Sequence, residues 1–147
     1  MTFDYNNIKS YKINKEEISY LRKKIFNETN ISKVLKKKGY YSKKIPLRKR
    51  KNMMTKHEAD ILLSTITGIY LSVFTELKHQ KYQLSEKELE FCGFILARLS
   101  YFEISDYYKI KLRDLFEMEI NIKNKLNLTD IGMSFLDVLV FFENKSM

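Results

Sequence analysis

The sequence predicts an all-α protein, and three observations support this prediction. One proline and four glycines among 147 residues leave few positions that interrupt helices. Apolar residues recur at steps of three and four in the middle of the chain. Two expected helices begin with Thr or Ser followed three positions later by Glu, the spacing of a capping box. We expect a helical arm or stalk, formed by N-terminal helices with a basic connector (1–54) and a long amphipathic helix (55–81), followed by a four-helix domain (82–147).

Two helices are expected in the N-terminal part. The first dozen residues show no clear period, and Asn14 can cap a helix over residues 15–27 whose first turn is acidic. The apolar stripe of this helix consists of Ile18, Leu21 and Ile25. A second, short helix over residues 31–38 begins after a Thr-Asn pair and ends at Gly39, because glycine readily adopts the conformation that closes a helix.

The amphipathic helix over 55–81 begins with the Thr55–Glu58 capping box. Its apolar stripe is wide and includes Leu62, Ile66, Ile69, Val73 and Leu77. A stripe of this width is typical of a helix that packs against another helix. Periodicity leaves open whether this helix belongs to the core of one chain or forms the contact between two copies.

The four helices of the last part follow in close succession. Ser85 and Glu88 form the second capping box of a helix that runs to about residue 99, and Ser100 caps a short helix to residue 108. Residues 109–111 form a turn before a helix over 112–126. Thr129 caps a last helix to about residue 143, which is more apolar than one buried face requires.

Positive charge is concentrated in one segment. The net charge is +9, and residues 33–51 contain ten Lys or Arg with no acid between Glu28 and Glu58. Such a block attracts polyanions, and phosphate contacts release counterions. Gly39, Tyr40 and Tyr41 add flexible backbone and two rings on which bases can stack. We expect nucleic-acid contact; a plain solvated linker and another acidic partner are the alternatives. The predicted phosphate contacts are Lys36, Lys37, Lys38, Lys43, Lys44, Arg48, Lys49, Arg50 and Lys51.

The stretch 84–128 carries a recognisable set of residues. The lead-in Leu-Ser-x-x-Glu-Leu-x-x-Cys is met by Leu84, Ser85, Glu88, Leu89 and Cys92. The positions of a scaffold helix are met by Glu103, Ile104, Ser105, Tyr108 and Ile110, and those of the following helix by Leu115, Met118, Ile122, Lys125, Leu126, Asn127 and Leu128. In these residues the stretch resembles the LuxR-type, or GerE-type, DNA-binding domain.

The resemblance implies a helix-turn-helix whose second helix enters the major groove of duplex DNA. The DNA contacts that it assigns are Lys111, Arg113, Asn121, Lys123 and Lys125. It also implies a dimer contact through the final helix; packing of that helix on the expected 55–81 helix, within the core, is the alternative. The leading hypothesis is therefore a DNA-binding transcriptional regulator that acts as a homodimer and whose phosphate affinity comes mainly from residues 33–51.

The helix over 112–126 departs from the family's pattern. Lys111, Leu112 and Asp114 occupy the family's Ser, Pro and Thr places, and two carboxylates, Glu117 and Glu119, lie where phosphates are expected. A second hypothesis is accordingly a protein–protein interaction module, such as an adaptor or an inhibitor of a nucleic-acid enzyme. Its predicted interface consists of Phe116, Ile120, Phe135, Leu139 and Phe142.

The sequence offers no pattern of an enzyme. His57 and His79 are the only histidines and lie in no metal-binding spacing, so no metal or cofactor is expected. Cys92 sits in an apolar run and is expected to be a buried structural thiol. No signal peptide and no membrane-spanning run is apparent, and we expect a cytoplasmic protein without membrane contact.

Overall fold

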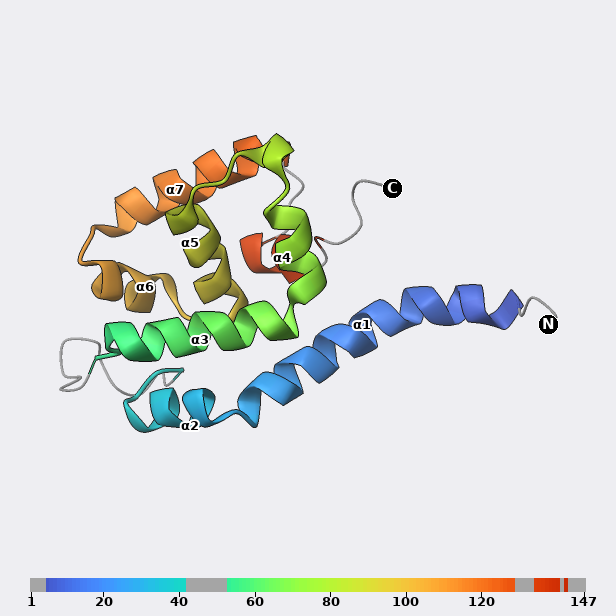
Figure 1. Cartoon of the computed structure of the whole chain (residues 1–147), viewed down its shortest axis with the longest axis horizontal. Coiled ribbons are helices and arrows are strands. Elements are labelled where there is room, and N and C mark those ends of the chain that lie inside the picture. Colours follow the sequence, from blue (N-terminus) through green and yellow to red (C-terminus); the bar gives the residue numbers. More distant parts are fainter. Residues whose placement is uncertain (1–4, 42–52, 129–133, 141, 143–147) are drawn as a thin grey trace.

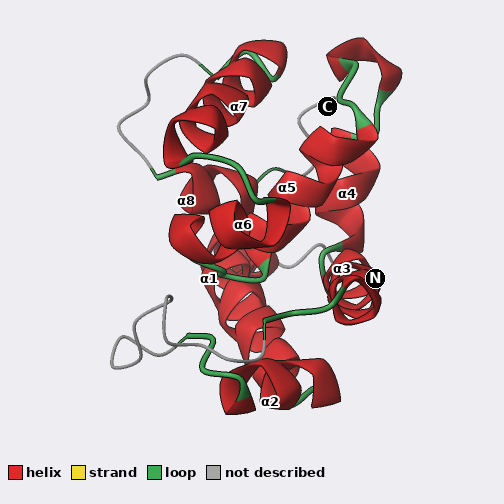
Figure 2. Ribbon diagram, turned by 90° about the vertical axis from the view of Figure 1, so that its left-hand side faces the viewer, coloured by secondary structure: helices red, strands yellow, loops and turns green. Residues whose placement is uncertain are grey.

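The computed structural model describes residues 5–41, 53–128, 134–140 and 142. Within them the regular elements are helices and no strand occurs, so the predicted all-α class is confirmed (Figures 1 and 2). The elements are α1 (Tyr5–Asn27), α2 (Asn30–Lys37), α3 (Lys56–Ile69), α4 (Leu71–Leu77), the 3-10 turn η2 (Gln80–Tyr82), α5 (Glu86–Leu96), α6 (Tyr101–Tyr108), α7 (Leu112–Lys125) and α8 (Phe135–Val140).

Local signals place most helix ends correctly. Both predicted capping boxes are present, and Ser100 with Glu103 forms a third at the start of α6. Thr29 caps α2, and Gly39 follows that helix with a φ of 94°, as expected for a glycine that ends a helix. Several boundaries differ from the prediction: α1 begins ten residues earlier, at Tyr5, and α5 ends at Leu96 because Arg98 has a left-handed φ of 67°. The last helix, α8, spans only Phe135–Val140, which is shorter than expected.

The prediction of a single long helix over 55–81 is wrong. The chain bends by 98° between α3 and α4, at Tyr70, whose φ of −108° and ψ of 41° depart from helical values. The apolar stripe was too wide for one face, and the bend allows Ile66 on α3 and Phe74 on α4 to enter the same core. No single helix among the described residues is long and apolar enough to cross a membrane, although α3 and α4 reach that composition when counted together.

Helix α5 lies at the centre of the packing and contacts both α3 and α8. Its residues 91–96 are all buried, including Cys92, as the sequence predicted. At Gly93 the helices approach so closely that an added Cβ would lie 2.6 Å from Cδ2 of Leu63 on α3. The buried residues form one cluster from Phe26 to Phe142, so the boundaries expected near residues 54 and 81 separate elements that share a core.

Helix α8 is a core element. Phe135 stacks on Phe91 of α5 with a ring-centroid distance of 6.0 Å, and Phe142 lies 5.6 Å from the ring of Tyr82. Leu139 is also fully buried. Assigning Phe135, Leu139 and Phe142 to a protein interface or a dimer contact was therefore wrong, because these side chains fill the monomer's own core. Thr129, the predicted cap, lies outside the described residues.

Candidate nucleic-acid interface

The chain that enters the basic connector is anchored at Tyr41. Its phenol Oη donates to the carbonyl of Ala97 (2.8 Å), and its backbone N–H donates to Oε2 of Glu103 (3.3 Å). Burial, followed by the nearby Glu103 carboxylate, raises the pKa of the Tyr41 phenol, which therefore stays protonated and donating. The connector thus starts from a fixed point at the junction of α5 and α6.

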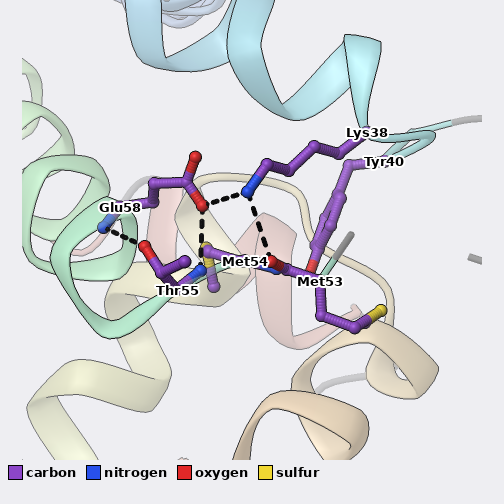
Figure 3. A network of polar contacts seen from close by, with 6 residues as sticks. All are labelled: Lys38, Tyr40, Met53, Met54, Thr55 and Glu58. Carbon is purple, nitrogen blue, oxygen red and sulfur yellow. Dashed lines mark hydrogen bonds and ion pairs between the residues drawn. The ribbon is translucent and has the colours of Figure 1, made fainter. Parts of the chain in front are cut away.

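The chain that leaves the connector is anchored by a second group of contacts, which we call the connector base: Lys38, Tyr40, Met53, Met54 and Glu58 (Figure 3). The Lys38 ammonium donates to Oε1 of Glu58 (2.5 Å) and to the carbonyl of Met53 (3.3 Å). The backbone N–H of Met54 donates to Tyr40 Oη (3.0 Å). Both ends of the segment between Tyr41 and Met53 are therefore fixed to the folded body.

Glu58 takes part both in the connector base and in the capping box at the start of α3. Its Oε1 accepts from Lys38 and from the backbone N–H of Thr55 (2.9 Å), while its own N–H donates to the Thr55 hydroxyl (Figure 3). Burial alone would raise the pKa of the Glu58 carboxyl, but the hydrogen bonds from Lys38 and Thr55 and the Lys38 charge outweigh it and lower that pKa. The ionised carboxylate is thus part of the folded state.

This lowered pKa predicts an acid-dependent loss of stability. A group whose pKa is depressed on folding stabilises the protein above its unfolded-state pKa, and that stabilisation is lost as pH falls through the folded-state value. Glu58→Gln should therefore cost about 1–2 kcal/mol at neutral pH, and the difference from wild type should shrink below about pH 4. Urea unfolding at several pH values measures both effects. Glu86→Gln, at an exposed position of α5, is the matched control, and an equal deficit for Glu58→Gln at every pH would contradict the assignment.

The structure places only part of the predicted phosphate-contact set. Lys36 and Lys37 are exposed on α2, next to the equally exposed Lys33. Lys38 is held by Glu58 and Met53 in the connector base and is not available to a phosphate in this arrangement, which corrects its assignment. The remaining predicted contacts, Lys43, Lys44, Arg48, Lys49, Arg50 and Lys51, lie outside the described residues.

Tyr40 and Tyr41 were expected to offer rings for base stacking, and this expectation is wrong. Tyr40 is 1% exposed, and Tyr41 packs against Phe26 with its hydroxyl bonded to the α5–α6 junction. Both rings anchor the connector instead. Sequence reasoning missed the roles of Glu58 and Glu103 as well, although each was visible as the acid three positions after a helix cap.

Helices α6 and α7 meet at a tight turn, as predicted. Lys109 ends α6 with a φ of 57°, and the Ser105 hydroxyl donates to the carbonyl of Ile110 (2.7 Å) to hold the turn. Leu115 and Ile122 are buried and fix the inward face of α7. The exposed face is consequently determined by packing, and among the positions assigned from the resemblance Lys111, Arg113 and Asn121 are exposed on it.

The two other assigned lysines of α7 are engaged within the chain. Lys125 pairs with Glu88 of α5 (2.6 Å) and donates to the carbonyl of Gln83 (3.3 Å). Lys123 pairs with Glu119 (3.3 Å) and lies over the ring of Phe135. These contacts tie α7 to α5 and α8. Both ammonium groups therefore already have partners within the chain and are not free to bind a DNA phosphate in this arrangement.

An apolar groove runs beside α7. Phe116 and Ile120 are 48% and 54% exposed, and the ring of Phe116 lies 5.2 Å from that of Tyr101. Among the described residues, a hollow of about 530 Å³ is lined by Leu99, Tyr101, Phe116, Phe135 and Leu136 together with Arg98, Glu119 and Lys123. Phe116 and Ile120 of the predicted protein-interaction surface are therefore accessible, whereas Phe135, Leu139 and Phe142 are at most 4% exposed, although Phe135 lines the hollow.

Comparison of the chain with protein-family models, curated proteins and solved structures gave no match. Within the described residues, no group of three or more His, Cys, Asp or Glu side chains is arranged to hold a metal ion.

Proposed function

We propose that this protein is a cytoplasmic DNA-binding regulator that acts by binding rather than catalysis. Its phosphate affinity comes mainly from the basic segment 33–51. The observation that carries the proposal is the fixation of both ends of the connector, at Tyr41 and in the connector base. Anchoring the ends of a cation-rich segment reduces the conformational entropy that it loses on binding a polyanion.

The charges of α7 support the same division of roles. Arg113, Lys123 and Lys125 are offset by Asp114, Glu117 and Glu119, so this helix has no excess positive charge. In addition, α2 and α7 lie at opposite ends of the view in Figure 2, with α3, α5 and α6 between them. The cations of α2 and those of α7 therefore do not form one continuous patch. We infer that α5–α7 is a LuxR-type helix-turn-helix that positions the protein, with few base contacts from α7.

The test is a binding titration of the purified protein against random duplex DNA, single-stranded DNA and RNA over a salt series. We expect the strongest binding to duplex DNA and a steep fall in affinity as salt rises, because each phosphate contact releases counterions. Absence of binding at low salt, or binding that salt leaves unchanged, would remove the basis of the proposal.

A second candidate function, protein–protein interaction through α7, is favoured by the exposed Phe116, which lines the groove, and by the exposed Ile120 on the same helix. It predicts that Ile120→Asp lowers the affinity for a protein partner at least about tenfold, because an apolar anchor at an interface centre contributes more than about 1.4 kcal/mol. The measurement is pull-down with the full chain, with circular dichroism as the test of folding. Ile61→Asp, at an isoleucine of α3 that is 41% exposed, is the control. A partner retained by Ile120→Asp would exclude this surface.

A further inference from the structure

Helix α1 carries two stripes of side chains, and only one of them is covered. On the covered stripe, Phe26 is buried and the guanidinium of Arg22 donates to Ser72 Oγ (3.1 Å) and lies over the ring of Tyr70 (5.1 Å). These contacts hold the second half of α1 against α3 and α4. The first half extends past the rest of the body, as Figure 1 shows.

The uncovered stripe is the apolar one that the sequence indicated. Ile18, Leu21 and Ile25 follow the spacing of three and four residues and are 43%, 51% and 52% exposed. Leu21 and Ile25 precede Arg22 and Phe26 of the covered stripe by one position each, which turns them about 100° around the helix axis. An apolar stripe with no cover along two helical turns is the ordinary seam of a pair of helices.

Charge along the same part of α1 is arranged in two halves. Glu16 and Glu17 precede the centre of the stripe, and Lys23 and Lys24 follow it. All four side chains are exposed, and none forms an ion pair within the described part of the chain. A parallel pair of such helices would place like charges together, whereas an antiparallel pair places the acids of each helix beside the lysines of the other.

We propose that this face binds a second copy of the chain, as an antiparallel α1–α1 dimer. With Leu21 at the twofold axis, Ile18 of one copy packs on Ile25 of the other. In this register Glu17 lies about one residue, or roughly 1.5 Å along the axis, from Lys24 of the other copy, a distance that a lysine side chain spans. The face is small for an interface, so the dissociation constant is expected in about the micromolar range or above. This dimer does not depend on nucleic-acid binding.

The first test measures mass against protein concentration by sedimentation, for the full chain without nucleic acid. Wild type should rise from 17.7 kDa toward twice that mass as concentration increases. Leu21→Asp should remain monomeric, with its dissociation constant raised at least about tenfold, because it places a charge at the centre of the apolar seam. Leu71→Asp, the same change at an exposed leucine of α4, should dimerise like wild type. A monomer at every concentration, or an unaffected Leu21→Asp dimer, would overturn the proposal.

The second test distinguishes an antiparallel from a parallel pair of α1 helices. Glu17→Lys and Lys24→Glu alone should each weaken the dimer about threefold to tenfold, since each converts both symmetry-related ion pairs into repulsions. A mixture of the two variants should form a heterodimer more stably than either forms a homodimer, because both of its inter-copy pairs are again opposite in charge. A mixture that associates no better than the separate variants would exclude the antiparallel seam, while circular dichroism confirms that each variant is folded.

Discussion

Replacing Arg48, Lys49, Arg50 and Lys51 with Gln is expected to lower the affinity for duplex DNA at least about tenfold at moderate salt. The slope of log affinity against log salt should also become shallower, by about 3 to 4, if all four side chains contact phosphate. Both effects share one cause: each lost contact leaves one phosphate with its counterions. The measurement is a fluorescence titration at several salt concentrations with a duplex of random sequence.

Charge alone also affects binding, and a matched pair of variants separates it from position. Lys49→Gln/Arg50→Gln and Lys78→Gln/Lys87→Gln both remove two charges from the net +9. Lys78 and Lys87 are exposed but lie far along the chain from the basic segment. The first variant should lower the slope by about 2, and the second should change only the affinity, slightly, through the long-range field. Equal effects of the two variants would mean that the segment has no special role.

The parts of the fold that the sequence predicts are those decided by neighbours along the chain. A cap and its acid lie three residues apart, so the starts of α3 and α5 followed from Thr55 and Ser85. The turn before α7 and its buried Leu115 and Ile122 followed in the same way from local period.

The parts that sequence reasoning missed are decided by contacts between distant residues. Lys38 meets Glu58 twenty positions away, and Lys125 meets Glu88 thirty-seven positions away. A count of cations along the chain treats these lysines like any other, although in the fold each is paired with a carboxylate. The same reason explains the bend at Tyr70, where the shape of the core decides the path of a helix whose local sequence favours continuation.

In the candidate nucleic-acid interface, too, the sequence predicts what is local and misses what depends on contacts between distant residues. Sequence reasoning located the basic segment by charge density, but it assigned the two tyrosines before it to base stacking. Whether a ring is a stacking surface or an anchor depends on its burial, and Tyr40 is buried against residues that follow the connector. The fixed ends are therefore a property that only the tertiary structure reveals, and their importance for binding can be measured separately from the charges.

Tyr40→Ala is expected to destabilise the protein by about 3–5 kcal/mol, the usual cost of deleting a fully buried aromatic ring. Tyr40→Phe keeps the ring and removes the oxygen that accepts from the Met54 N–H, which leaves a buried donor unpaired at a cost of about 1–3 kcal/mol. Urea unfolding monitored by circular dichroism measures both. Tyr20→Phe, which removes an exposed hydroxyl on α1, is the control and should unfold like wild type.

The folded Tyr40→Phe variant then tests what the anchoring contributes to binding. It retains every cation of the basic segment, so the number of phosphate contacts and hence the salt slope should equal those of wild type. Its affinity for duplex DNA should nevertheless fall several-fold, because a segment that is held less firmly loses more conformational entropy when it binds. A changed slope would show that Tyr40 determines which cations reach the phosphates. Wild-type affinity with wild-type slope would show that the charges bind equally well without the anchor, and the observation on which the proposed function rests would then have no functional consequence.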